Sequence, residues 1–281
     1  MSCSQAGGMA CVNMGDATRK INSSFQLYPN HVKITEFFLK KDFSVLPDIL
    51  WRKQTNKANK FMGSGMLPTN AYVTLEHEYI LIFRKGKKPR NFKPKSKRRY
   101  NSAYFWEERN KWFSDIWFDI KGTLQNLNNN ELRDRAAAFP IELPYRLINM
   151  YSVQGDTVLD PFWGTGTTSL AAMISARNSV GYELEKDFMK VFDKRVKKVK
   201  RINEAVNKGR IQRHLTFQKE REKEGKELSY KASNYNFNVT TKQERKIRFY
   251  SIEHLKKEKN IYKAFHHIRD QPVGDTLSEQ T

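Results

Sequence analysis

The stretch "TVLDPFWGTGTTSLAA", residues 157–172, joins a short apolar run to a run of small residues through two glycines. The apolar run predicts a buried strand, the small residues predict a helix, and "SVGYE" at 179–183 predicts a second, parallel strand. Gly164 and Gly166 suit a turn with positive φ, in which the backbone can approach a ligand closely. The stretch therefore predicts a βαβ unit with a ligand-binding turn, because open α/β sheets bind ligands at the carboxyl ends of their strands.

The side chains around this turn indicate the class of ligand. Asp160 ends the first strand, and Thr167 or Thr168 is expected to cap the helix, whose N-terminus offers N–H groups and a positive dipole end. Glu183 ends the second strand and could accept hydrogen bonds from two adjacent ribose hydroxyls. No lysine follows the glycines as in a triphosphate loop, and the spacing differs from the three-glycine dinucleotide fingerprint. The pattern favours a nucleoside without a long phosphate tail; the alternative is a tight turn beside a surface glutamate.

Composition limits the class of partner. The 281 residues include 51 Lys and Arg against 30 Asp and Glu, a formal net charge of +21, which favours a polyanion and nucleic acid first. No apolar run approaches the roughly 18 residues of a spanning helix, and the N-terminus does not resemble a secretory signal, so we expect a cytoplasmic protein without a membrane partner. Cys3 and Cys11 are the two cysteines, too few for a disulfide framework and without nearby histidines, so no metal site is expected.

Four motifs together resemble a known family. "DPFWGTGTT" resembles the cofactor motif of the DNA amino-methyltransferases, which methylate cytosine N4 or adenine N6 with S-adenosylmethionine. "AAAFPIELPYRLI" resembles the family's Phe-Pro motif, which lies beside the methionine end of the cofactor; here these residues are Phe139 and Pro140. "GGMACVNMGDA", "DILWRK" and "EHEYILIFRKG" are similar to strands five, six and seven of the family's sheet. The order of the motifs is that of the permuted β branch. The resemblance implies a Rossmann-like α/β fold and these cofactor-binding residues: Phe139, Pro140, Asp160, Pro161, Phe162, Gly164, Gly166, Thr167, Thr168 and Glu183.

One element of that family is absent from these residues. The family holds the flipped base by a Pro-Pro turn that ends in an aromatic residue, and none of the nine prolines of this sequence is adjacent to another. In the β branch the turn precedes "GGMACVNMGDA", and Met1 stands six residues before that segment, so we expect a missing N-terminal segment. The family's strand order is three-two-one-four-five-seven-six, and strand four carries the turn. We therefore expect a partial sheet without its central strand, in which strands one and five either pair directly or leave unpaired edges. The catalytic residues remain unknown, and a second polypeptide is one source of the turn.

The resemblance divides the chain into four regions. We expect catalytic-half strands at residues 1–85, a target-recognition insert at 86–130, the cofactor-binding half at 131–202 and a basic C-terminal extension at 203–281. Residues 84–100 sit where the family inserts its recognition region and contain ten basic residues and no acid. These residues either contact the phosphates of double-stranded DNA or form a solvated charged loop. The candidate DNA-binding residues are Arg84, Lys85, Lys87, Lys88, Arg90, Lys93, Lys95, Lys97, Arg98 and Arg99.

Several weaker patterns complete the prediction. The Trp and Phe residues of 101–125 are expected to be mostly core, a basic helix should run from about Lys186 to about Ile202, and "IEHLKKEKNIYKAFHHI" at 252–268 is expected to be helical. Asp16 and Lys53 are candidates near the expected base pocket, but neither is assigned a catalytic role.

Three functions are compatible with the sequence. The leading hypothesis is a site-specific DNA amino-methyltransferase of a restriction–modification system, with cytosine N4 favoured over adenine N6. The absent Pro-Pro turn favours a non-catalytic protein or subunit that binds the cofactor and DNA. An RNA methyltransferase is the third hypothesis.

Overall fold

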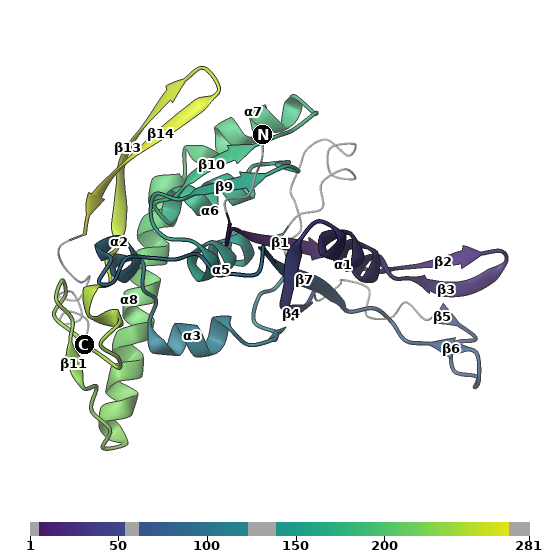
Figure 1. Cartoon of the computed structure of the whole chain (residues 1–281), viewed down its shortest axis with the longest axis horizontal. Helices are drawn as coiled ribbons and strands as arrows, with labels where there is room; N and C mark the ends of the chain where they lie inside the picture. The colour runs from purple at the N-terminus through teal and green to yellow at the C-terminus, as the bar shows by residue number, and fades with distance from the viewer. Residues whose placement is uncertain (1–5, 54–61, 123–138, 270–281) are drawn as a thin grey trace, which may run out of the picture. The chain divides into compact units, whose positions relative to one another are not determined.

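The computed structural model describes residues 6–53, 62–122 and 139–269 (Figure 1). They form two compact units: the first takes its described residues from Met1–Asn91, Ser114–Asn126 and Ala138–Pro140, and the second from Phe92–Phe113 and Ile141–Thr281. Parts of several predictions lie outside the described residues, namely Cys3, residues 123–130 of the insert, the start of "AAAFPIELPYRLI" and residues 270–281 of the extension.

The first unit is built on a four-stranded sheet. Its strands occur in the order β1-β7-β4-β8, and they are β1 (Met9–Met14), β4 (Phe43–Arg52), β7 (His77–Lys85) and β8 (Ile116–Trp117). Residues 80–83 of β7 are each at most 1% exposed, as a continuous apolar run in a central strand requires. The helix α1 (Asn30–Lys40) packs on this sheet, with the Phe38 ring stacked on Phe83 at 4.1 Å. The three strands predicted in this half are confirmed.

Two short hairpins extend from the first unit. They are formed by β2 (Ala17–Ile21) with β3 (Ser24–Tyr28) and by β5 (Met62–Gly63) with β6 (Ala71–Tyr72).

The second unit contains the predicted βαβ unit. The strands β9 (Thr157–Asp160) and β10 (Asn178–Gly181) pair in parallel, with Asp160 opposite Gly181, and α6 (Thr167–Ile174) connects them. Leu170, Ala171 and Ala172 of α6 are at most 1% exposed, and the two small alanines let neighbouring elements approach closely. The helices that pack with α6 around this core are α5 (Glu142–Tyr151), α7 (Asp187–Val196) and α8 (Val199–Lys223).

The strand pairings match the family's order on either side of the expected gap. β10 and β9 correspond to strands two and one, and β1, β7 and β4 correspond to strands five, seven and six. Within the described residues β9 pairs only with β10, and β1 pairs only with β7. Because β9 belongs to the second unit and β1 to the first, the pairing of strands one and five stays a prediction.

The basic helix after Glu183 differs from its prediction. It is interrupted between α7 and α8, and α8 continues to Lys223 rather than ending near Ile202. The buried face of α8 carries polar residues that bond into the core: Asn203 Nδ2 donates to the Ile174 carbonyl at 3.0 Å, and Asn207 Nδ2 donates to the Tyr250 carbonyl at 2.9 Å. A pattern based on apolar spacing cannot detect such a face.

The predicted helix at 252–268 is wrong. These residues belong to an antiparallel hairpin of β13 (Tyr250–Glu258) and β14 (Ile261–Ile268). Burial along β14 alternates with a period of two, as a strand with one covered face requires. In β13 the register shifts between Ile252 and His254, and this irregularity breaks the alternation that would have indicated a strand.

Part of the region predicted as a polar extension, residues 211–249, forms a second core with residues 103–105. Phe105, Ile211, Tyr235 and Phe237 are at most 5% exposed in it, and the His214 ring stacks on Phe105 at 3.9 Å. The elements that contribute to this second core are α8, β11 (Tyr230–Lys231) and β12 (Asn238–Val239). The second unit also contains α2 (Lys97–Asn101), α3 (Trp106–Trp112) and the 3₁₀ turn η1 (Glu244–Lys246).

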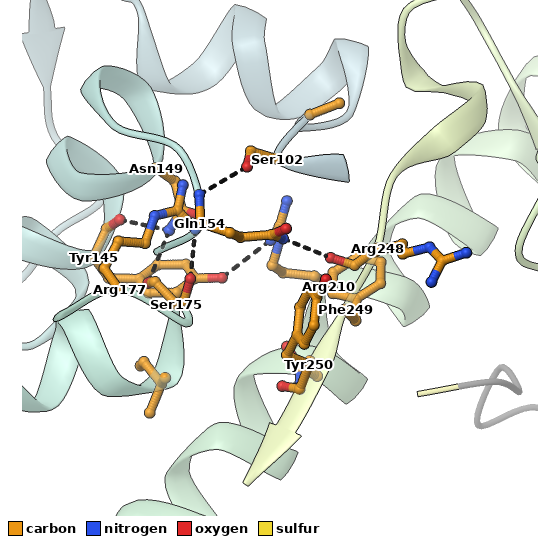
Figure 2. Close-up of a pocket in the computed structure, with 13 residues that line it drawn as sticks. Ser102, Tyr145, Asn149, Gln154, Ser175, Arg177, Arg210, Arg248, Phe249 and Tyr250 are labelled. Atoms are coloured by element: carbon orange, nitrogen blue, oxygen red, sulfur yellow. Dashed lines mark hydrogen bonds between the residues drawn. The ribbon is translucent and has the colours of Figure 1, made fainter. Parts of the chain in front are cut away.

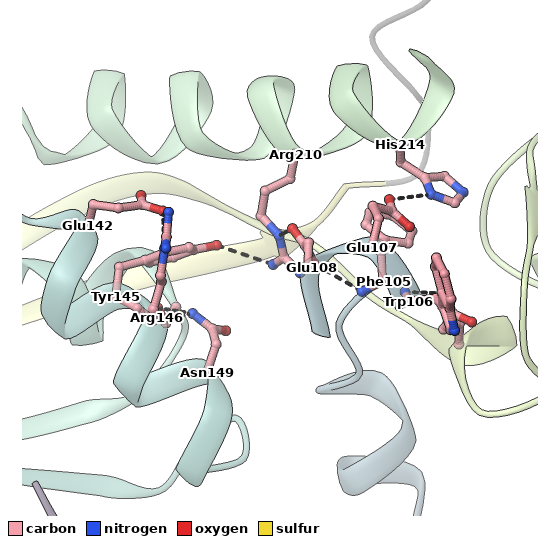
Figure 3. A network of polar contacts seen from close by, with 12 residues as sticks. Phe105, Trp106, Glu107, Glu108, Glu142, Tyr145, Arg146, Asn149, Arg210 and His214 are labelled. Carbon is pink, nitrogen blue, oxygen red and sulfur yellow. Dashed lines mark hydrogen bonds and ion pairs between the residues drawn. The ribbon is translucent and has the colours of Figure 1, made fainter. Parts of the chain in front are cut away.

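A buried ion pair joins α8 to α3 in the second unit. Arg210 donates from Nε and from a terminal guanidinium nitrogen to the two carboxylate oxygens of Glu108, each at 2.6 Å, and its other terminal nitrogen reaches the Tyr145 hydroxyl of α5 at 3.2 Å (Figure 3). Although burial alone would lower it, the pKa of Arg210 is raised by the Glu108 carboxylate.

Most of the predicted core aromatics are confirmed. Phe105, Trp112 and Trp117 are at most 3% exposed, and Phe113 is half-buried against the core around α6, whereas Trp106 and Phe118 are exposed.

Candidate functional site

The glycine turn lies at the carboxyl end of β9, where the sequence predicted it. The Phe162 N–H donates to Asp160 Oδ1 at 3.0 Å, which closes the start of the turn. Gly164 has a φ of 52° and Gly166 a φ of 73°, the left-handed conformation that glycine adopts without steric cost. Phe162 is 89% exposed beside this turn.

The predicted threonine cap is wrong. The residue that precedes α6 is Gly166, no side chain caps the helix, and Thr167 is the first helical residue. The Thr167 hydroxyl instead accepts a hydrogen bond at 2.9 Å from Arg195 of α7, which also donates to the Thr165 hydroxyl at 2.6 Å and to the Thr165 carbonyl at 2.8 Å. Burial lowers the pKa of Arg195. The turn thus has a guanidinium against its inner side, a feature that the sequence interpretation missed.

Glu183 is brought directly to the glycine turn. Its carboxylate accepts hydrogen bonds from the N–H groups of Gly164 at 2.7 Å and of Leu184 and Glu185 at 2.9 Å each. The Tyr182 N–H donates to the Asp160 carbonyl at 3.0 Å, which continues the pairing of the two strands into the turn. Asp160, Gly164 and Glu183 are therefore held in one cluster, as predicted. The exposed carboxylate can accept about four hydrogen bonds and here accepts three.

Trp163 forms the wall beneath this cluster and was not predicted as a site residue. It is 9% exposed, its indole Nε1 donates to Ser169 Oγ at 2.8 Å, and its ring packs against Phe192 at 4.7 Å. A Cβ at Gly181 would lie 2.0 Å from Trp163 Cδ1, and a Cβ at Gly166 would lie 2.3 Å from Phe192 Cδ2. The packing of these rings therefore requires both glycines, and backbone conformation requires glycine at Gly166 as well.

The remaining predicted cofactor residues occupy different places. Pro161 is exposed in the turn, and Thr168 is half-buried in the first turn of α6. Phe139 and Pro140 are half-buried residues just before α5. Pro140 belongs to the first unit and the glycine turn to the second, so the structure describes them separately. The role of the Phe-Pro motif stays a prediction.

The basic run is divided between the two units. Arg84, Lys85, Lys87, Lys88 and Arg90 belong to the first unit, and Lys93, Lys95, Lys97, Arg98 and Arg99 belong to the second. Several of these cations have contacts within the protein: Arg84 donates to the Lys87 carbonyl at 2.8 Å, Lys85 donates to the Lys41 carbonyl at 2.7 Å, and Arg98 pairs with Asp156 at 2.8 Å. The run is thus neither one continuous loop nor wholly solvated.

The two polar candidates of the first unit have structural partners. Asp16, with a side chain only 4% exposed, accepts from the His31 N–H at 3.1 Å and contacts His31 Nδ1 at 2.6 Å, which anchors the start of α1. Lys53 pairs with Glu78 at 2.7 Å. These contacts account for both residues without a catalytic role.

A polar cavity lies elsewhere in the second unit (Figure 2). Arg177, Arg210 and Arg248 line it, and its lining includes no residue of the glycine turn. In the described part of the chain no helix is long and apolar enough to cross a membrane, and no group of three or more His, Cys, Asp or Glu side chains is placed to hold a metal ion.

Comparisons with known proteins agree with this geometry. A DNA methylase family model matches residues 3–194. The type II methyltransferase M.MthZI of Methanothermobacter thermautotrophicus is 56% identical over 275 residues, which cover 97% of this chain and 76% of that protein. The type II methyltransferase M.MjaI of Methanocaldococcus jannaschii is also 56% identical, over 72% of this chain and 68% of that protein.

A solved structure provides a fold comparison. The Thermus thermophilus protein TTHA0409, complexed with S-adenosyl-L-methionine, matches with a TM-score of 0.55 and 32% identity, over 69% of this chain and 70% of that one. The family match covers more than half of this chain, and its strands occur in the family's order. This chain therefore belongs to the DNA methylase family of S-adenosylmethionine-dependent amino-methyltransferases.

Proposed function

We propose that this protein transfers a methyl group from S-adenosylmethionine to an exocyclic amine of a base in double-stranded DNA, as part of a restriction–modification system. The observation that carries the proposal is the cluster of Asp160, Gly164 and Glu183 at the carboxyl end of β9. The relatives named type II methyltransferases and the S-adenosylmethionine complex of TTHA0409 support it.

Within this proposal Glu183 binds the ribose of the cofactor. Three backbone N–H groups already hold its carboxylate, so two ribose hydroxyls need one of these bonds to be released. Release of the hydrogen bond from the Gly164 N–H would also free a donor toward the ligand, because this N–H belongs to the turn itself. The exposed Phe162 ring is available to pack against the adenine. The bound cofactor would supply an electrophilic methyl group.

The proposed cofactor site includes the other predicted residues. Pro161, Gly166, Thr167 and Thr168 shape the turn and the start of α6, and Phe139 and Pro140 would flank the methionine end.

Calorimetry with S-adenosylmethionine tests the role of Glu183. Glu183→Ala should weaken binding by about 1.5–3 kcal/mol, or roughly 10- to 150-fold, because charge-assisted hydrogen bonds are lost. Glu183→Gln keeps an acceptor for the backbone N–H groups and separates loss of charge from loss of the turn. The matched control is Glu185→Ala, whose carboxylate accepts from the Asp187 N–H at 3.3 Å. Equal affinities for Glu183→Ala and Glu185→Ala in folded proteins would remove Glu183 from the site.

We further propose that a polypeptide beyond these 281 residues supplies the Pro-Pro turn, in the same chain or in a second one. No two prolines are adjacent in this sequence, so these residues can bind the cofactor without holding the flipped amine. Positioning of the amine accounts for much of such a rate. Residues 1–281 alone should therefore transfer tritiated methyl groups to mixed duplex DNA poorly or not at all.

Adding a polypeptide that contains the turn should restore transfer by several orders of magnitude. Robust transfer by residues 1–281 alone would show that another turn of this chain positions the amine. Persistent inactivity with intact binding of both ligands would instead select the non-catalytic function.

For the methylated atom we propose cytosine N4 rather than adenine N6. The residue that distinguishes the two amines begins the Pro-Pro turn and so lies outside this sequence. Nucleoside analysis of the methylated DNA decides between N4-methylcytosine and N6-methyladenine.

A further inference from the structure

The second unit brings two basic segments together that are far apart in the sequence. The helix α2, "KRRYN" at 97–101, lies against η1, within "TKQERKIRF" at 241–249. The Arg248 N–H donates to the Asn101 carbonyl at 3.0 Å, and Gln154 Nε2 donates to both the Asn101 and the Arg248 carbonyls at 3.2 Å each (Figure 2 shows Gln154 and Arg248). These bonds fix the two segments side by side.

The acid between these cations is directed away from solvent. Glu244 is 3% exposed, and its carboxylate accepts from the Trp106 N–H at 2.7 Å and from the Thr241 N–H and hydroxyl at 2.6 Å each. Because Glu244 is the only acidic residue in 97–101 and 241–249, no acidic side chain of either segment lies on the surface.

Most basic side chains of the two segments are exposed, whereas Arg248 is half-buried. Five of the exposed side chains form a surface, here called the cation patch, that consists of Lys97, Arg98, Arg99, Arg245 and Lys246. Arg98 also pairs with Asp156 at 2.8 Å. The Lys246 ammonium also lies over the Tyr100 ring at 5.9 Å, so the η1 segment reaches across α2. Like charges held together repel one another, and a bound polyanion relieves that repulsion.

We propose that the cation patch is one phosphate-binding surface for duplex DNA, to which the C-terminal segment contributes Arg245 and Lys246. The inference rests on the proposed function and extends it, because these two residues lie beyond the family match, which ends at residue 194. Exposed Arg and Lys side chains are the groups that contact DNA phosphates most often, and such contacts set position and affinity rather than sequence.

The salt dependence of DNA binding tests the proposal. In wild-type protein the logarithm of the affinity should fall linearly with the logarithm of salt concentration. Arg245→Gln/Lys246→Gln should reduce this slope by up to about 1.8, since each lost phosphate contact is worth about 0.9. Lys97→Gln/Arg99→Gln should do the same, and the quadruple variant should reduce it by up to about 3.6.

The matched control is Lys256→Gln/Lys263→Gln. It removes the same formal charge from the hairpin, where both lysines pair with Glu258 at 2.9 and 2.7 Å, and it should leave the slope unchanged. Thermal melts of each variant establish that it is folded.

The possible outcomes separate the two proposals. If the salt dependence of DNA binding has the same slope for Arg245→Gln/Lys246→Gln as for the control, while wild-type protein still binds DNA, the inference about the C-terminal segment is overturned. The proposed function then stands. If wild-type protein shows no salt-dependent binding to duplex DNA, both fall. Tighter binding to structured RNA than to duplex DNA of equal length would overturn DNA as the ligand of the patch.

Discussion

Gly181→Ala adds one methyl group at the base of the proposed cofactor site. The added Cβ would lie 2.0 Å from Trp163 Cδ1 and 2.4 Å from Trp163 Cγ, far inside van der Waals contact. Gly181 does not have a positive φ, so the substitution tests side-chain packing without backbone strain.

The Trp163 ring has little freedom to move away. Its indole N–H is bonded to Ser169, and its ring packs against Phe192, both in the interior of the second unit. Overpacking of a close-packed interior typically costs 1–3 kcal/mol. For a chain of this size we expect Tm to fall by roughly 2–12 °C. Because Trp163 is part of the glycine turn, the affinity for S-adenosylmethionine should fall as well.

Thermal melts monitored by circular dichroism and calorimetry with S-adenosylmethionine measure both effects. The control is Gly209→Ala, where the nearest atom to a new Cβ is the flexible end of Arg213 at 3.2 Å. Gly209 lies inside α8, so alanine there should stabilise the helix by up to about 1 kcal/mol. The same chemical change should thus have opposite signs at the two positions. A Gly181→Ala protein with unchanged Tm and cofactor affinity would refute the packing argument.

Two further predictions concern contacts of the second unit. Glu108→Gln should destabilise the protein by about 3–5 kcal/mol, since it leaves the buried Arg210 guanidinium without its counter-charge. The double variant Glu108→Leu/Arg210→Met should destabilise the protein less, because it removes both charges. Denaturant unfolding of both variants measures the difference. Hydrogen bonds from Lys257 and Tyr262 hold the pKa of Asp193 below its ordinary value. At this partly exposed site they should stabilise the folded protein by less than about 1 kcal/mol. This stabilisation should be present above pH 3.8 and be lost as the pH falls below it, which an NMR titration can follow.

The parts of the fold that the sequence predicted are those with local signals. The apolar run of β7 and the glycines between β9 and α6 indicate their conformations over a few residues. The parts that it missed depend on contacts between distant segments. Asn203 and Asn207 form a buried face of α8 only because carbonyl groups of α6 and β13 lie opposite them.

The candidate site shows the same division. Glu183 was predicted because it was expected to end the second strand; β10 ends two residues earlier, at Gly181, and the contact of Glu183 with Gly164 is observed. Thr167 was expected to cap α6 because its residue type favours caps, but Arg195 of the following helix competes for its hydroxyl. Arg195 and Trp163 act on the turn through tertiary contacts, for which the spacing of residues in the chain gives no signal.

The expected strand four would link catalysis to stability. In the family's order, strand four lies between the counterparts of these two strands; β9 pairs with β10 in the second unit, and β1 pairs with β7 in the first. Unpaired strand edges are unfavourable, so a polypeptide that supplies strand four with the Pro-Pro turn should bond to both strands. Titration of residues 1–281 with such a polypeptide should therefore raise Tm and methyl transfer together, with the same midpoint. Restoration of transfer without any rise in Tm would show that the added turn reaches the base without joining the sheet.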